Sequence, residues 1–351
     1  MKVSIAIAVL LALIYFARFY KPYSLDKVLD HYGFTTSQQK RALHDLYQKA
    51  TGMPWQEAFS SRHTKKALMR DILTFIEKTQ EKFIVRKGLQ ERWEVEALPW
   101  MTQNKGEILD DLRTLGFIEE IEPTHKHVDA ICILGATWKT MLRQFQYTHC
   151  LLKSGVTAPS LIFLGGERYV TVGVDGTEEE LSALAAKLGV SDWRQLTEAH
   201  LMTELYTTSK IKNQKITPYF INTPKGDLPR PTTQTTMMEL ITWLKHHPEI
   251  KSLLFVSPQP HVKYQEAIIQ SIFADQHKAL SFHVVGPGVT NSQNMKPLIE
   301  GLGSYLWATT PPLLAQLGLE ERDPHIIAEL KELYNKNPLM YKELPAILRT
   351  P

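Results

Sequence analysis

The sequence predicts an α/β fold: a doubly wound, mainly parallel Rossmann-like sheet with an added N-terminal helical region and a membrane anchor. Three observations support this fold: short apolar runs after residue 127 that end in small or turn residues, helical stretches between these runs, and an uncharged apolar segment at the amino terminus. The expected organisation is a membrane anchor or uncleaved signal-like segment over 1–20, a helical region over 21–122, and a Rossmann-like domain with C-terminal helices over 123–351.

Composition limits the class of protein. A chain of 351 residues can bury a sizeable core, and its 43% hydrophobic and 22% charged residues are ordinary globular values. The net charge of +3, without a long Lys/Arg block, gives no case for a nucleic-acid partner. The two cysteines, Cys132 and Cys150, are too few for a disulfide framework and have no metal-ligand spacing, so no metal site is predicted. Cys132 lies in an apolar run and is expected to pack in the core.

The amino-terminal segment "VSIAIAVLLALIYFA", residues 3–17, contains no charge. It is shorter than the roughly 20 residues of a typical spanning helix, and the bulky residues 18–21 offer no small-x-small cleavage site. These features favour an uncleaved anchor, and a buried helix of a soluble protein is the alternative. Basic residues at both ends leave the orientation open.

The segment between the anchor and the sheet has apolar residues at helical spacing. We expect helices over 37–50 and 64–83, which Ser37 and Thr64 can cap. The stretch "ERWEVEALPW", residues 91–100, breaks this pattern and predicts a short strand.

The second part of the chain alternates strands and helices. The predicted strands are 128–136, 161–166, 217–223, 252–257 and 281–288. The helices expected between them are 138–154, two pieces over 178–206, 233–246 and 261–274. Right-handed crossovers between parallel strands then give an open sheet covered on both faces. The tail, 322–350, is predicted to be helical and structural.

Glycines stand where the predicted strands end: Gly135, Gly165, Gly166, Gly286 and Gly288. Ligands of such sheets bind outside the carboxyl ends of the strands, where glycine permits positive φ and a close approach of the backbone. Neither a dinucleotide fingerprint nor a P-loop pattern is present, so a plain turn is the alternative for each glycine.

Two residues are candidates for chemistry at this edge. Glu198 lies near the start of a helix, where the helix dipole favours its carboxylate, and is a candidate general base. His261 opens the helix after the fourth strand and can bind phosphate or shuttle a proton. The alternatives are plain helix-start electrostatics for Glu198 and a surface position for His261.

Threonines gather after Arg230, at Thr232, Thr233, Thr235 and Thr236. Capping explains one or two of them, and the others predict an anion or sugar contact.

We expect one shared pocket formed by Gly165, Gly166, Glu198, Thr233 and His261, because parallel strands bring their carboxyl ends to one edge. Gly166→Val is expected to block ligand binding at little cost in stability.

The segment 177–205 imitates a helix-turn-helix. Thr177 and Glu180 form a capping box for its first helix, and Ser191 is the expected cap of its second. Acidic residues on the second helix would repel phosphates, so we interpret the segment as a helical hairpin inserted between the second and third strands.

Six motifs occur in an order that resembles the SanA/YdcF/ElyC-like family of bacterial envelope proteins: "VDAICILGA", "RQFQYTHCLLKSG", "IFLGGE", "TEAHLM", "PTTQTTMMEL" and "LLFVSPQPH". The resemblance covers about residues 128–275. It implies single-pass attachment to the bacterial inner membrane through the N-terminal helix, with the domain on the periplasmic side.

Together with the residue arguments above, the resemblance gives a candidate site. The catalytic candidates are Glu198 and His261. The ligand-binding candidates are Gly135, Arg143, Gly165, Gly166, Thr233, Thr236, Ser257 and Lys263.

The chain departs from the family pattern at two positions. Tyr264 stands where the family has Arg, so that Lys263 offers a cation without a bidentate fork, and Thr236 stands where an Asn-like residue is usual. The sequence therefore leaves two functions open, and names no cofactor. One is a membrane-anchored envelope protein that binds a phosphorylated, nucleotide-like or lipid-carrier-linked ligand, as a hydrolase or transferase of envelope metabolism. The other is a non-catalytic membrane-tethered interaction scaffold with a degenerate pocket.

Overall fold

A computed structural model describes residues 24–59, 64–86, 90–91, 94–276, 280–290 and 294–316, together with positions 328 and 332. The predicted anchor, and the predicted tail apart from those two positions, lie outside the described residues. Within the described ranges, none of the helices combines the length and the apolar composition that a membrane span requires.

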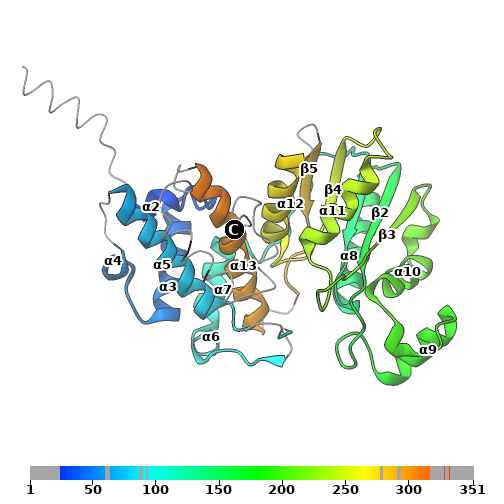
Figure 1. Ribbon diagram of the computed structural model, residues 1–351, viewed down its shortest axis with the longest axis horizontal. Helices are drawn as coiled ribbons and strands as arrows, with labels where there is room; N and C mark the ends of the chain where they lie inside the picture. The colour runs from blue at the N-terminus through cyan, green and yellow to red at the C-terminus, as the bar shows by residue number, and fades with distance from the viewer. Residues whose placement is uncertain are drawn as a thin grey trace, which may run out of the picture.

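Five parallel strands form the sheet, which confirms the predicted α/β fold (Figure 1). The strands are β1 (Ala130–Leu134), β2 (Ser160–Gly166), β3 (Thr217–Thr223), β4 (Ser252–Val256) and β5 (Ser281–Val285). Their order is β3-β2-β1-β4-β5, so the direction of winding changes between β1 and β4. In open α/β sheets this change marks the crevice where ligands bind.

Helices cover both faces of the sheet. They are α8 (Trp138–Lys153) and α10 (Glu198–Thr208) on one face, and α11 (Thr233–Leu244) and α12 (Val262–Gln276) on the other. In β1, Ile131 and Ile133 pack on the α8 side, while Cys132 packs on the α11 side. Burial of both faces explains why the strands read as continuous apolar runs.

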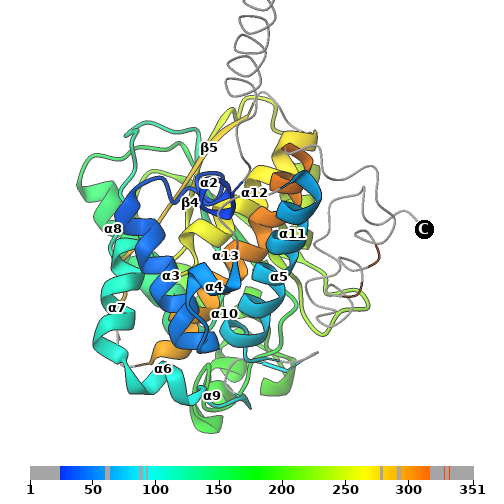
Figure 2. The same cartoon turned by 90° about the vertical axis from the view of Figure 1, so that its left-hand side faces the viewer.

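A second lobe consists of helices with their own core (Figures 1 and 2). Its elements are α2 (Leu25–Val28), α3 (Ser37–Thr51), α4 (Trp55–Ala58), α5 (Lys65–Phe83), α6 (Pro99–Gln103), α7 (Lys105–Thr114) and α13 (Met295–Gln316). Helix α13 packs against both α5 and α12, so it joins this lobe to the sheet. The helical core therefore includes residues from both sides of the predicted boundary at 123.

Several expected helix boundaries differ in the structure. Thr36, not Ser37, caps α3 and accepts the Gln39 N–H, whereas Thr64 caps α5 as predicted. The described residues of 91–100 contain no strand. Helix α6 begins there at Pro99, because proline lacks the N–H that a first helical position leaves unused.

The inserted hairpin lies between β2 and β3, as predicted. It contains α9 (Glu178–Leu188), the short 3-10 helix η2 (Trp193–Gln195) and α10, and is followed by η3 (Lys210–Asn213). Thr177 and Glu180 form the predicted capping box of α9. The expected Ser191 cap is wrong, because Asp192 caps η2 and α10 begins only after Thr197.

Candidate functional site

The glycines at the carboxyl edge provide close packing rather than an unusual backbone. Gly135, Gly165 and Gly166 do not have positive φ, so that part of the expectation is wrong. A Cβ built on Gly135 would lie 1.8 Å from Glu198 Oε1, and one on Gly165 would lie 2.9 Å from the Cα of Ala199. These glycines allow the start of α10 to lie directly on the ends of β1 and β2.

Gly166 makes the equivalent approach on the other face of the sheet. A Cβ at this position would lie 2.7 Å from Cγ of Pro231, two residues before Thr233 opens α11. Side chains alternate along a strand, so Gly165 meets α10 on one face and Gly166 meets the start of α11 on the other. The two helix starts therefore converge on the same strand end.

Glu198 is the first residue of α10, and its carboxyl group is largely buried, with 12% of the side chain exposed. The backbone N–H of Glu198 donates to the carbonyl of Arg168 at 2.9 Å. This bond holds the start of α10 against the segment that follows β2. Desolvation raises the pKa of the carboxyl from 4.5 to about 7, although Arg168 and Arg230 both act to lower it. A carboxyl with this pKa can accept or donate a proton near neutral pH.

Arg168 makes most of the polar contacts at this edge, and it was not among the predicted site residues. Its Nε donates to Glu198 Oε2 at 3.2 Å, and Nη1 and Nη2 form a bidentate pair with Asp175 at 2.9 and 3.0 Å. Nη2 also donates to the carbonyl of Ala136, just after β1. Arg168 therefore ties together the ends of β1 and β2, the hairpin loop and α10. The only sequence signal was the charged "ER" directly after the paired glycines.

Asp175 uses its carboxylate to cap a helix. Besides Arg168, its oxygens accept the N–H of Trp138, the first residue of α8, at 3.0 Å and the N–H of Thr171 at 2.9 Å. The start of the helix after β1 is a common phosphate site in such folds. Here an internal carboxylate already occupies the first N–H of α8, so a ligand anion cannot use that donor.

The start of α11 has its own polar groups. Thr232 and Thr235 are mutual caps, which explains two of the four threonines, and Thr236 is buried in the first turns of the helix. Thr223, at the end of β3 and paired in register with Gly166, is 1% exposed, and its Oγ1 has no hydrogen-bond partner among the described residues. This hydroxyl was not predicted, because a threonine in a strand is most often a packing residue.

Arg230 lies just before this helix and contributes a positive charge that Glu198 senses. Its Nε pairs with Glu91 Oε1 of the helical lobe at 2.8 Å. Its Nη1 and Nη2 make no hydrogen bond within the part of the chain that the structure describes.

The remaining candidates belong to the β4 and β5 side of the edge. Ser257 is buried directly after β4. A Cβ built on Gly286 would lie 1.6 Å from the carbonyl oxygen of Ser257, so these two backbones are in close contact. Arg143 of α8 donates through Nη2 to the carbonyl of Gly288 at 2.6 Å, and no carboxylate within the described ranges pairs with it. His261 directly precedes α12, the helix that follows β4. Because β1 lies between β2 and β4, the axes of β2 and β4 are about 10 Å apart.

Lys263 does not face the edge. Its Nζ donates to the carbonyl of Leu115 at 2.9 Å and lies within 6.0 Å of the ring centroids of Phe34, Phe117 and Tyr305. The lysine therefore joins α12 to the helical lobe, and its prediction as a ligand residue needs correction. Sequence spacing from His261 could not show this, because it does not indicate which face of α12 meets another lobe.

The structure thus places Gly135 and Gly165 against the start of α10, at Glu198 and Ala199. Gly166 lies against Pro231, two residues before Thr233, on the other face of the sheet. Among the described residues, no group of three or more His, Cys, Asp or Glu side chains could hold a metal ion. Comparison of the chain with protein-family models, with curated protein sequences and with solved structures found no match. The resemblance to the SanA/YdcF/ElyC-like family therefore stays a prediction.

Proposed function

We propose that the carboxyl edge of the sheet binds a small phosphorylated or nucleotide-like ligand, and that Glu198 transfers a proton during its hydrolysis or group transfer. The observation that supports this most directly is the buried Glu198 carboxyl, whose pKa is raised to about 7 and which lies on Gly135 at the end of β1. Proton transfer by a positioned carboxyl group is typically worth 10²- to 10⁴-fold in rate.

The groups available for the anion lie on the α11 side of the edge. Nη1 and Nη2 of Arg230 have no partner in the described residues, and the buried Thr223 hydroxyl has none either. Since Asp175 already binds the start of α8, the proposed position of the ligand is between Glu198 and the start of α11.

The experiment is a titration of the full-length protein with ATP, AMP, pyrophosphate and a sugar phosphate, with heat of binding and phosphate release as readouts. We expect Arg230→Met to weaken binding about tenfold or more, since hydrogen bonds to charged groups are worth about 1.5–3 kcal/mol. Glu198→Gln should retain binding and reduce turnover. Glu179→Gln, an exposed glutamate in the first turn of α9, is the matched control. If none of these anions binds, the proposal is excluded.

A membrane-tethered scaffold without turnover is the second candidate. Close packing at the three glycines and the internal pairs Arg168–Asp175 and Arg230–Glu91 favour it, because they satisfy much of the edge without a ligand. Anion binding without phosphate release, unchanged in Glu198→Gln, would support this candidate.

The proposed location is the outer face of a bacterial inner membrane, with residues 3–17 as the anchor. A reporter that is active only in the cytoplasm, fused to the carboxyl terminus, should stay inactive. Activity of that reporter would contradict the location.

A further inference from the structure

The charges of two arginines act on Glu198, and these arginines differ in how firmly their carboxylate partners are held. Arg168 forms a bidentate pair with Asp175, whose side chain is fully buried and also accepts two backbone N–H groups. Arg230 has a single bond within the described ranges, from its Nε to Glu91 Oε1 at 2.8 Å, and these two side chains are 30% and 24% exposed. Glu91 is therefore the carboxylate that an anion can displace without breaking a buried network.

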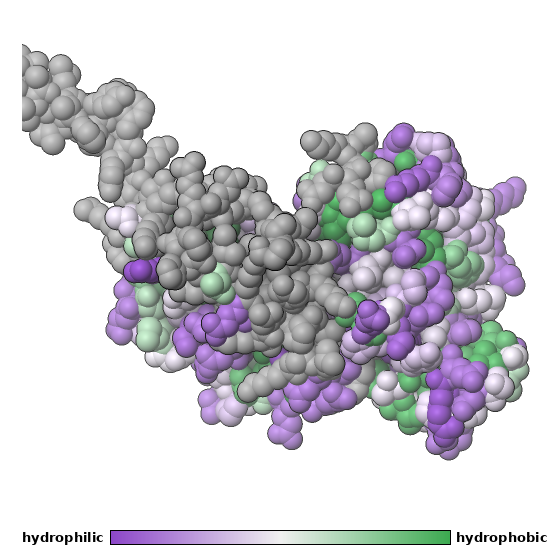
Figure 3. All heavy atoms as spheres, in the orientation of Figure 1, coloured by the Kyte–Doolittle hydropathy of each residue, from purple (hydrophilic) through white to green (hydrophobic). Residues whose placement is uncertain are grey.

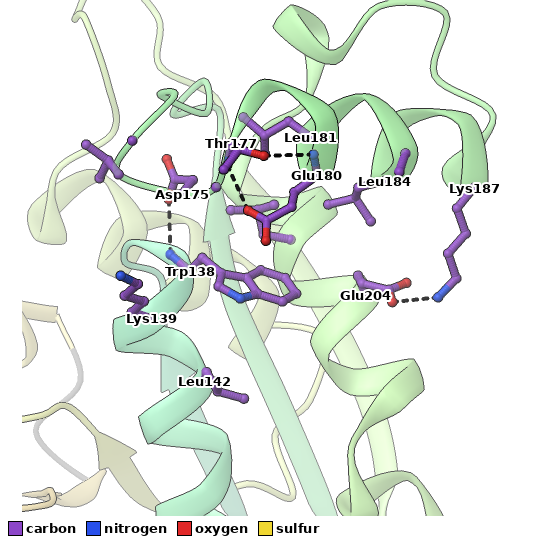
Figure 4. Close-up of a pocket in the computed structure, with 15 residues that line it drawn as sticks. Trp138, Lys139, Leu142, Asp175, Thr177, Glu180, Leu181, Leu184, Lys187 and Glu204 are labelled. Carbon is purple, nitrogen blue, oxygen red and sulfur yellow. Dashed lines mark hydrogen bonds and ion pairs between the residues drawn. The ribbon is translucent and has the colours of Figure 1, made fainter.

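Hydrophobic side chains reach the surface around α9 (Figure 3). A groove of about 700 Å³ lies there, between the first turn of α8, the loop over 173–177, α9 and α10 (Figure 4). It shares the Arg168–Asp175 pair with the Glu198 edge, because Asp175 forms part of its wall. Its charged lining residues are three carboxylates and two lysines: Asp175, Glu180, Glu204, Lys139 and Lys187. The groove therefore offers an anion no surplus of positive charge, which leaves Arg230 as the cation for a ligand of the edge.

The backbone on both sides holds the contact between Arg230 and Glu91 in place. Arg230 stands between Pro229 and Pro231, and proline restricts both its own φ and the conformation of the residue before it. On the side of the helical lobe, the Glu94 carboxylate accepts the backbone N–H of Glu91 at 2.8 Å. The two side chains therefore meet between the lobes as a preformed pair.

The Glu91 carboxylate binds Arg230 in the way that a ligand anion would. A guanidinium binds a phosphate most tightly through two parallel N–H bonds. Glu91 already takes Nε, and its negative charge lies beside any anion that binds to Nη1 or Nη2 of the same guanidinium. A ligand therefore gains the full charge of Arg230 only when Glu91 leaves.

We propose that Glu91 is an autoinhibitory residue of the anion site: its carboxylate takes the place of the ligand on Arg230, and the ligand displaces it. This regulation rests on the proposed function, because it acts at the same site. Since linkage is reciprocal, anion binding at the edge weakens the contact that Glu91 makes between the lobes. The helical lobe thus lowers the affinity of the edge through one side chain.

The test is calorimetric titration of the full-length protein with pyrophosphate. Glu91→Gln keeps the shape of the side chain and an oxygen that can accept a hydrogen bond, but it removes the charge. We expect this variant to bind pyrophosphate about fivefold more tightly, as expected for the loss of one partly exposed ion pair. Glu96→Gln is the matched control, because Glu96 is exposed in the same segment and pairs with no cation among the described residues. It removes the same charge and should change the affinity by less than about twofold.

A double variant tests whether Glu91 acts through Arg230. Arg230→Met alone and Arg230→Met combined with Glu91→Gln should bind pyrophosphate equally weakly, because Glu91 then has no cation to occupy. Tighter binding by the double variant, or equal effects of Glu91→Gln and Glu96→Gln, would overturn the proposal, since Glu91 would act by its charge alone. Equal affinity of Glu91→Gln and the native protein would also overturn it but would leave the anion site in place. If neither of these two proteins binds pyrophosphate, the anion site is excluded and the autoinhibition with it.

Discussion

The Glu198 edge and the groove beside α9 share the Arg168–Asp175 pair, but they are built in opposite ways. At the edge, glycines allow helix starts to touch the strand ends, and buried charges are held by one another. In the groove, α9 stands away from α8, and apolar side chains line an open volume. The two regions therefore differ in what they bury: the edge buries paired charges, whereas the groove keeps apolar side chains around an open volume.

The strongest test of this comparison removes the shared pair. Arg168→Met should destabilise the protein by about 3–5 kcal/mol, since it leaves the fully buried Asp175 carboxylate without its cation. Arg194→Met removes an arginine whose side chain is 68% exposed and should cost less than about 1 kcal/mol. Urea denaturation of both variants measures the difference. If both lose the same free energy, the buried network does not hold the edge together.

A second variant distinguishes the loss of a partner from the loss of packing. Arg168→Met combined with Asp175→Asn should be more stable than Arg168→Met alone, because the unpaired carboxylate is then absent. No recovery in the double variant would show that packing of the arginine stem, not charge, is what Arg168 contributes.

The next test concerns the pH dependence of the edge. Because burial raises the pKa of Glu198 from 4.5 in its ordinary state to about 7, the folded protein holds this proton more tightly than the unfolded chain. Its contribution to stability is present in full below about pH 4.5 and is lost as pH rises through 7, by up to about 3 kcal/mol. Glu198→Gln cannot lose a proton, so its stability relative to the native protein should increase between pH 4.5 and 8. Denaturation curves across this range measure the effect, and a constant difference would show that the carboxyl titrates at its ordinary pKa.

The third test uses the glycine contacts. Gly166→Val was expected to cost little stability, but the Cβ would lie 2.7 Å from Pro231 Cγ, so we now expect a loss of about 1–3 kcal/mol together with the loss of ligand binding. Gly106→Ala is the control, because no atom lies within 4 Å of its Cβ and its φ is helical. This control should be neutral or stabilising by up to about 1 kcal/mol. Thermal unfolding compares the two variants, and an unchanged melting temperature for Gly166→Val would mean that Pro231 moves away easily.

The strands were predictable from the sequence for a physical reason. Burial on both faces makes each strand a short apolar run, and the turn residues after each run marked where it ended. The same reasoning placed Glu198 at a helix start and Gly166 at a strand end. It could not give the role of the glycines, because close approach and positive φ require the same residue type.

The parts of the site that were missed depend on contacts between segments distant in the sequence. Asp175 lies in a glycine-containing loop and becomes important only because Arg168 and the start of α8 fold onto it. Glu91 reaches Arg230 from the helical lobe, 139 positions away in the chain. No local pattern distinguishes such charged residues from solvated surface residues. The same limit explains why Lys263 was predicted as a ligand residue: its neighbours come from the helical lobe, which is distant in the sequence.

The smallest expected effect separates the edge from the contact between the lobes. Lys263→Met keeps the apolar stem but removes the hydrogen bond to Leu115 and the ammonium beside three aromatic rings, so we expect a loss of about 1–2 kcal/mol. Anion binding at the Glu198 edge should not change, because the ammonium points into the helical lobe. Denaturation and nucleotide titration of the same sample measure both quantities. Weaker nucleotide binding at unchanged stability would return Lys263 to the ligand site and would show that the edge extends across β4 to α12.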